Sequence, residues 1–311
     1  MSRLLFLFLD GVGLGQADSG HNPFAVARTP VLEALLEGRR LVVGAAPFEG
    51  RLATLLEVDP CLGAAGTPQS ASGQAVLLTG INVPKLIGGH YGPKPNEAIR
   101  RILEHGNLFI EVLQSGGRAA LLNAYPPRYF ESINSRRRLY SSIPLAVTAA
   151  GLSLMTAEDL QGGRALAPDF TAAGWAAQPD FPPAPVYDPL QAGALLASLS
   201  GKYDLAWFDG WPTDYAGHRG TMAQAVGLVE TIDTVLGGLV QGWGQRNDLI
   251  VLTSDHGNLE DLGKRGHTMN PVPALMIGPQ ALRRTFAKGL RDLTGFAPAI
   301  RKLLSLPSPP A

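Results

Sequence analysis

The feature of this sequence that most constrains its fold is a series of short, continuous apolar runs that end abruptly in Asp or Gly. Strands buried on only one face alternate apolar and polar residues, whereas strands of a parallel sheet covered by helices are apolar throughout. Helix-like segments separate the runs, as in an α/β fold. We therefore predict an α/β fold whose mostly parallel sheet contains strands at residues 4–9, 118–123, 203–208 and 249–253.

The intervals between these runs carry helical patterns. We expect helices at residues 29–38, 70–79, 96–105, 109–115 and 221–240. Residues 128–194 differ, because they combine weak strand signals with an arginine triplet and a proline-rich stretch at 179–189. We predict that residues 128–194 form a small cap or lid, inserted into a core made of residues 1–127 and 195–311.

Composition excludes several classes of protein. The 311 residues contain 26 basic and 26 acidic side chains, and zero net charge argues against nucleic-acid or anionic-membrane partners. Cys61 is the single cysteine, which rules out a disulfide framework, an iron–sulfur cluster and a cysteine-rich zinc site. No stretch approaches the roughly 20 apolar residues of a membrane helix. We expect a cytoplasmic protein that acts on a small molecule; its oligomeric state is not indicated.

Carboxylates follow three of the predicted strands. Asp10 ends the first run, Asp209 ends the run at 203–208, and Asp255 comes just after residues 249–253. In an open parallel sheet, ligands bind beyond the carboxyl ends of the strands, so these side chains should lie at one edge. Converging carboxylates repel each other unless cations offset the charge. The arrangement therefore predicts a metal site.

Histidines complete the candidate ligand set. Asp214 and His218 are four residues apart, which places both on one face of a helical turn. His256 adjoins Asp255, and His267 lies eleven residues further on. Each residue alone is as easily a surface or capping residue as a ligand. As an ordered set, three carboxylates and three imidazoles without a thiolate suit one or two divalent ions such as Mn²⁺ or Zn²⁺.

Ser70 is the candidate nucleophile. It precedes a helix-like run and is placed at the expected N-cap, where free N–H groups and the helix dipole favour an anion. A serine coordinated by a metal that lowers its pKa can attack phosphorus directly. The alternatives are that Ser70 is a plain capping residue, or that Ser72, two residues into the helix, is the nucleophile.

These motifs together resemble the alkaline phosphatase superfamily, and within it the branch of cofactor-independent phosphoglycerate mutase and phosphopentomutase. Each motif alone has low specificity, but their order along the chain is highly specific. The resemblance rests on Asp10-Gly11 with Asn22 and Thr29-Pro30, Ser70 ten residues before Gly80, Asp214-x-x-x-His218, Ser254-Asp255-His256-Gly257-Asn258, and His267-Thr268 with Asn270-Pro271-Val272-Pro273.

The resemblance implies a three-layer α/β/α core of the alkaline phosphatase type, and a metal-dependent phosphohydrolase or phosphomutase. It implies that Ser70 forms a phosphoserine intermediate, which passes to water in a hydrolase or to a second hydroxyl in a mutase. It also implies two divalent ions, Mn²⁺ or Zn²⁺. One would be held by Asp10, Ser70, Asp255 and His256, and the other by Asp214, His218 and His267.

Two further residues are candidate substrate ligands. Residues 124–129 (AYPPRY) are loosely similar to a mutase segment that ends in Lys-Tyr, so Arg128 is expected to replace that lysine as a phosphate ligand. His90 lies in a glycine-rich loop after the nucleophile helix and could orient substrate there, although a loop histidine is more often without such a role.

The sequence also departs from the resembling families. Phosphoglycerate mutases of this type carry a large second domain after the nucleophile helix, where this chain has only residues 81–105. We therefore expect hydrolysis of a small-molecule phosphate ester, with a phosphomutase or a non-catalytic metal-binding relative as alternatives. Sulfatases need Pro two residues and Arg four residues after the nucleophile, but Ser72 and Gln74 stand there.

Two motifs of other protein classes, a dinucleotide-binding fingerprint and an esterase nucleophile elbow, are present only in part. Gly11, Gly13 and Gly15 follow a predicted strand as in a dinucleotide-binding fingerprint, but Gln16 stands where the last glycine is needed. An esterase nucleophile elbow needs glycines two residues on either side of the serine, and Ser70 lacks both.

Overall fold

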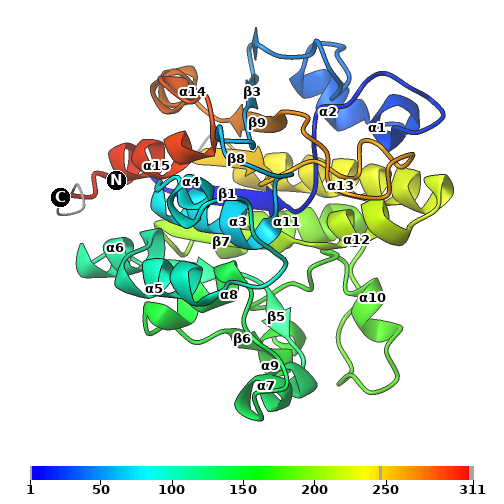
Figure 1. Cartoon of the computed structure of the whole chain (residues 1–311). Coiled ribbons are helices and arrows are strands. Elements are labelled where there is room, and N and C mark those ends of the chain that lie inside the picture. The colour runs from blue at the N-terminus through cyan, green and yellow to red at the C-terminus, as the bar shows by residue number, and fades with distance from the viewer. Residues whose placement is uncertain (1, 245–246, 308–311) are drawn as a thin grey trace.

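The computed structural model describes residues 2–244 and 247–307. Within them, one central sheet has the strand order β2-β3-β9-β8-β1-β7-β4 (Figure 1). Neighbours among β4, β7, β1 and β8 pair in parallel, and β9, β3 and β2 extend the sheet through antiparallel pairs. The strands are β1 (Leu4–Leu9), β2 (Phe48–Glu49), β3 (Ala53–Val58), β4 (Ala119–Leu121), β7 (Leu205–Gly210), β8 (Leu249–Thr253) and β9 (Val272–Ile277).

Helices cover both faces of this sheet because its central strands are apolar on both sides. Along β1, Leu5 and Leu7 pack into one core, whereas Leu4 and Phe6 pack into the other. The first core is closed by α1 (Pro23–Val26), α2 (Pro30–Leu35), α11 (Pro189–Ser200), α12 (Pro212–Arg219) and α13 (Met222–Trp243). The second is closed by α3 (Ser70–Thr79), α4 (Val83–Ile87), α5 (Glu97–His105), α6 (Leu108–Gln114), α8 (Ser142–Ala149), α14 (Gln280–Ala287), η1 (Leu293–Gly295) and α15 (Phe296–Leu304).

The α/β/α architecture and the mostly parallel sheet confirm the predicted fold class. β1 and β8 have the predicted bounds, β7 lies two residues later than expected, and β4 is shorter. The sequence did not predict β2, β3 or β9. β9 contains Pro273, and proline weakens a strand signal because it cannot donate to a neighbouring strand.

A smaller unit projects from the main body below the sheet in Figure 1. It contains β5 (Ala124–Tyr125), α7 (Pro127–Asn134), β6 (Met155–Thr156), α9 (Ala157–Gln161) and α10 (Ala173–Ala176), and it has its own apolar cluster around Trp175. α8 lies within the same stretch of sequence but packs against α3 and α5 in the main core. We propose that the predicted cap at 128–194 corresponds to this smaller unit, without α8 and without residues 189–194, which belong to α11 in the main core.

One helix is longer and more apolar than the sequence analysis allowed. The 22 residues of α13 meet the length and hydropathy of a membrane span, contrary to our expectation that no stretch does so. Half of the helix's apolar window is buried inside the protein, where α13 packs along α11. Asp233 in its middle accepts hydrogen bonds from the N–H groups of Val31 and Leu32, at 3.0 and 2.8 Å. These contacts are those of a core helix.

Candidate active site

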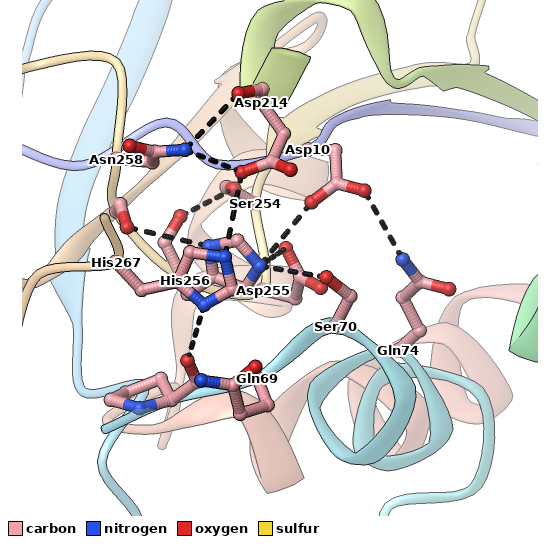
Figure 2. A network of polar contacts seen from close by, with 12 residues as sticks. Asp10, Gln69, Ser70, Gln74, Asp214, Ser254, Asp255, His256, Asn258 and His267 are labelled. Atoms are coloured by element: carbon pink, nitrogen blue, oxygen red, sulfur yellow. Dashed lines mark hydrogen bonds and ion pairs between the residues drawn. The ribbon is translucent and has the colours of Figure 1, made fainter. Parts of the chain in front are cut away.

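Asp10 and Asp255 face each other at the carboxyl edge of the sheet. They follow β1 and β8, which are paired in parallel, so the fold brings both carboxylates to the same place. His256 joins them, with its Nε2 atom 3.4 Å from Asp10 Oδ1 and 3.7 Å from Asp255 Oδ1 (Figure 2). All three side chains are buried. The first predicted ligand cluster is therefore assembled by neighbouring strands.

This cluster lacks compensating donors. Asp10 Oδ1 and both carboxylate oxygens of Asp255 have no hydrogen-bond partner in the described part of the chain. Burial, reinforced by repulsion from neighbouring carboxylates, raises the pKa of Asp10 and of Asp255 well above the usual value. Buried, unpaired carboxylates are costly, and such groups are normally paired or bound to metals. Their donor set fits a divalent cation.

Ser70 lies beside this cluster. Its Oγ atom is 3.0 Å from His256 Nε2. Ser70 is the first residue of α3 and Gln69 is the N-cap, so the predicted capping position is wrong by one residue. Ser72 does not face the cluster in the same way: its buried hydroxyl donates to the Gln69 carbonyl and accepts from the N–H of Tyr91. Those two hydrogen bonds give Ser72 a structural role.

A second group of ligands gathers around α12. Asp214 and His218 lie on adjacent turns of this helix, with His218 Nε2 3.4 Å from Asp214 Oδ2. His267 approaches from the loop before β9, and its Nε2 atom is 3.6 Å from Asp214 Oδ1 and 3.3 Å from His218 Nε2. The structure thus brings together the three residues that were predicted as the second set.

Each of the three histidines presents its Nε2 atom to the carboxylates. The Nδ1 atoms contact backbone carbonyls: His267 with Pro68 at 2.8 Å, His256 with Gly257 at 3.3 Å, and His218 with Arg265 at 3.4 Å. A carbonyl only accepts hydrogen bonds, so these contacts favour the tautomer with the proton on Nδ1 and a free lone pair on Nε2. Metal-binding histidines are oriented by such contacts.

His256 connects the two groups. Its ring stacks on that of His267, with centroids 3.7 Å apart, and burial holds its pKa well below the usual value. Ligand atoms of Asp10, Asp255 and His256 lie within 4.8 Å of one another, and so do those of Asp214, His256 and His267. The two groups of predicted ligands are therefore adjacent, and His256 belongs to both.

Several positioning residues were missed by the sequence analysis. Asn258 donates from its Nδ2 atom to Asp214 Oδ1 at 2.7 Å, which fixes that carboxylate. Buried Glu260 accepts hydrogen bonds from the N–H groups of Gly13 and Asn258 and from Asn270 Nδ2. It thereby joins the loop that follows β1 to both ends of the connection between β8 and β9. An isolated glutamate has no pattern that predicts this role.

Glu260 also explains the glycines that imitate a dinucleotide fingerprint. A Cβ atom at Gly13 would lie 2.3 Å from Glu260 Oε1, and one at Gly257 would lie 2.2 Å from the same atom. The glycines after β1 allow the backbone to approach a buried carboxylate, and no nucleotide is needed to account for them.

The two predicted substrate ligands lie in different places. His90 is near the site, because the N–H of the next residue, Tyr91, donates to the Ser72 hydroxyl. The His90 Nε2 atom contacts the Cys61 carbonyl at 2.9 Å. Its buried Nδ1 atom has no hydrogen-bond partner among the described residues. Arg128 lies in the smaller unit, where its guanidinium covers the Phe181 ring at 4.3 Å. A role for either residue in binding substrate stays a prediction.

Comparison with known proteins finds a family model that is similar to part of this chain. A family model described as the metalloenzyme superfamily matches residues 190–307, which include Asp214, His218, Asp255, His256 and His267. The alkaline-phosphatase-type resemblance inferred from the sequence motifs is thereby confirmed.

Named relatives are also similar to part of this chain. The 2,3-bisphosphoglycerate-independent phosphoglycerate mutase of Rhodopseudomonas palustris is 37% identical over 123 residues, which are 37% of this chain and 23% of the mutase. The chain thus matches less than a quarter of that relative's length. A similar fold occurs in the PH0037 protein from Pyrococcus horikoshii (TM-score 0.56, 17% identity, covering 100% of this chain and 98% of that one).

Alkaline phosphatase from the Antarctic bacterium TAB5 has the same fold as well, with a TM-score of 0.52 and 13% identity over 98% of both chains. The matched family model describes metalloenzymes, and two of the named relatives are a mutase and a phosphatase, in keeping with the predicted class of metal-dependent enzyme. Likeness at this level of identity leaves the reaction and the substrate to be argued from the site.

Proposed function

We propose that this protein hydrolyses a small-molecule phosphate monoester through a phosphoserine intermediate on Ser70, at a centre that holds two divalent cations. The observation that carries the proposal is the position of the Ser70 hydroxyl, 3.0 Å from His256 Nε2 and next to buried carboxylates that lack partners. A plain capping serine would not require such neighbours.

The residues that would hold the cations follow from the two groups of ligands. Asp10, Ser70, Asp255 and His256 would bind one ion, and Asp214, His218 and His267 the other, with His256 at the boundary. When bound, such ions lower the pKa of a coordinated hydroxyl and neutralise charge on a transferring phosphoryl group. Oxygen and imidazole ligands accept either Mn²⁺ or Zn²⁺.

The chain's own residues account for the chemistry of the two steps. In the first, Ser70 Oγ forms a bond to phosphorus, the bond from phosphorus to the ester oxygen breaks, and the alcohol leaves with a proton. In the second, water attacks phosphoserine, which restores the Ser70 hydroxyl and releases phosphate. Ser70 begins a helix, so phosphate would lie near the positive end of the α3 dipole.

Hydrolysis is favoured over mutase chemistry by what lies beside the site. A mutase must hold its dephosphorylated intermediate during turnover, which an enclosing domain would achieve. Here only the short helices α4, α5 and α6 lie between α3 and β4, and a cavity of about 470 Å³ opens beside Asp10, Asp214 and His218. Phosphomutase activity is the second candidate because curated relatives are named mutases.

The decisive assay compares wild-type protein with Ser70→Ala after metal removal and readdition of Mn²⁺ or Zn²⁺. We expect metal-dependent hydrolysis of p-nitrophenyl phosphate that Ser70→Ala abolishes, with little turnover of bis-p-nitrophenyl phosphate. Equal turnover by Ser70→Ala would contradict the assignment of the nucleophile. Metal binding without turnover of any ester, and without phosphoryl transfer between hydroxyls, would support the non-catalytic alternative.

A further inference from the structure

Helix α12 presents a second set of side chains next to its metal ligands. Trp211, Tyr215 and Arg219 follow one another at intervals of four residues. Trp211 already has helical backbone angles, and the Tyr215 N–H bonds to its carbonyl, so this spacing is helical from the first member. We call Trp211, Tyr215 and Arg219 the aromatic stripe.

The aromatic stripe and the ligand pair form one continuous surface. At about 100° per residue, Asp214, His218, Trp211, Tyr215 and Arg219 lie in that order across an arc of about 140°. The opposite side of α12 is buried through Thr213, Ala216 and Gly217. All five residues of the arc, together with Asp10, line the cavity of about 470 Å³. A substrate bound to the metals would therefore extend over this stripe.

The stripe is exposed in a way that packing does not explain. Trp211 is 48% exposed and Tyr215 is 57% exposed, whereas the other three tryptophans are at most 4% exposed. Burial of a large aromatic side chain is worth a few kcal/mol, so an exposed indole beside a polar site indicates a surface that a ligand covers. Because the stripe is part of the cavity that contains the metal ligands, that ligand is the substrate.

We propose that the aromatic stripe recognises the leaving group of the substrate, and that this leaving group carries a planar ring that stacks on Trp211. The inference rests on the proposed phosphatase function and specifies its substrate class. Trp211 lies one turn before Asp214 on the same side of α12, so a ring joined to the phosphate through a short linker would lie on the indole. Nucleoside monophosphates and aryl phosphates share this chemistry.

Tyr215 and Arg219 extend the recognition surface beyond the indole. The Arg219 guanidinium lies over the Tyr215 ring, 5.9 Å from its centroid, and adds a permanent positive charge to a cavity otherwise lined by acidic, imidazole and aromatic groups. Arg219 covers one side of Tyr215, whereas no cation lies over the Trp211 ring among the described residues, so we assign the stacking to Trp211. Arg219 is available to acceptor atoms at the far edge of the ring.

Fluorescence tests the stacking without requiring turnover. Because Trp211 is exposed and the other tryptophans are buried, acrylamide should quench mainly Trp211 in the metal-loaded wild-type protein. We expect adenosine 5′-monophosphate and phenyl phosphate to protect it, and ribose 5-phosphate not to do so. Trp211→Phe should lack the acrylamide-sensitive emission. Equal protection by all three esters, or an indole that acrylamide cannot reach without ligand, would overturn the inference.

Kinetics test the same inference separately from the function. Base stacking on an aromatic side chain is worth about 1–3 kcal/mol, which predicts a roughly 5- to 150-fold loss of kcat/KM for the ring-bearing esters in Trp211→Ala. Ribose 5-phosphate should be hydrolysed equally by both proteins. Leu86→Ala, at an exposed site outside the cavity, is the control and should change neither value.

Failure of the proposed ring recognition and failure of the proposed phosphatase function would give different results. Turnover with the same loss for ring-bearing and ring-free esters would overturn the role of the aromatic stripe and leave the phosphatase function standing. Protection of Trp211 by ring-bearing ligands without any turnover would support the stripe and contradict the proposed function. Distinguishing nucleosides from aryl groups requires only the ratio of adenosine 5′-monophosphate to phenyl phosphate activity.

Discussion

Single residues at the carboxyl edge of the sheet carry charge that the protein does not neutralise by itself. Asp10 and Asp255 lack donors for three of their four oxygens in the described part of the chain, and one oxygen of Asp209 is buried without a partner in the same way. Asp209 is adjacent to Asp10 in the fold because β7 pairs with β1. Substitution of a single one of these carboxylates should therefore change the pKa values of its neighbours and the affinity of the site for metal.

Asp209 should make stability depend on pH. Burial raises its pKa to about 7 from an ordinary value of 3.8, an effect that the charge of Lys94 partly offsets. Between about pH 4 and 7 the folded protein therefore binds a proton that the unfolded chain has released, so stability falls as pH rises. Asp209→Asn removes this titration. In EDTA, we expect its gain in unfolding free energy over wild type to grow from pH 4 to 8, by a few kcal/mol. A gain that is constant with pH in denaturant titrations would contradict the prediction.

Asn258 should control metal affinity without contacting the metal. It donates to Asp214 Oδ1 at 2.7 Å and to the Asp214 carbonyl at 3.1 Å. Loss of such an orienting contact typically weakens metal binding about 10- to 100-fold. We expect this loss in Asn258→Ala, measured by calorimetric titration with Mn²⁺ or Zn²⁺. Asn96→Ala removes a helix cap at α5 and is the matched control, with lower stability but unchanged affinity.

At the scale of elements, the sequence predicted what local patterns encode. Continuous apolar runs predicted β1 and β8 with their observed bounds, and the spacing of Asp214 and His218 predicted that both lie on one face of α12. β9 was missed because Pro273 lies in it and because its pairing with β3 and β8 is decided by distant parts of the chain. Glu260 was missed for the same reason, since its hydrogen-bond partners come from the loop after β1 and from two distant parts of the connection between β8 and β9.

The loop after β1 should tolerate no side chain at Gly13. A Cβ atom there would displace the Glu260 carboxylate, whose hydrogen bonds to Gly13 and Asn258 are buried. Hydrogen bonds to a buried charge contribute about 1.5–3 kcal/mol each, so Gly13→Ala should lower stability by about 2–4 kcal/mol. Gly227→Ala, in α13 with open space around its Cβ position, should instead raise stability by up to about 1 kcal/mol. Thermal unfolding of both variants checks this difference, and equal effects would contradict it.

For the whole molecule, the metal centre links folding to function. Asp10 and Asp255 follow β1 and β8, which are far apart in the sequence, and α3 and α12 add further predicted ligands from between them. Cations bound only by the folded chain stabilise it, by about 2.7 kcal/mol at a hundredfold excess over the dissociation constant. The location of the protein in the cytoplasm and the choice between Mn²⁺ and Zn²⁺ stay predictions.

Asp255→Asn should therefore raise stability in the absence of metal and reduce the gain in stability that metal gives. In EDTA at pH 8, we expect a higher melting temperature than that of wild type, because the amide relieves repulsion with Asp10. On addition of Mn²⁺ or Zn²⁺, wild type should gain several degrees and Asp255→Asn much less. An equal metal response in the two proteins would show that Asp255 is not a ligand.

Mapping of the phosphorylated residue is the most direct test of the proposed phosphoserine intermediate on Ser70. Metal-loaded wild-type protein would be mixed with substrate, quenched in acid within the first turnover, digested, and sequenced by mass spectrometry. We expect a single phosphoryl group on Ser70. This group should be absent when EDTA is added first, and absent in Ser70→Ala. A phosphoryl group on Ser72, or turnover with no phosphorylated residue at all, would contradict it.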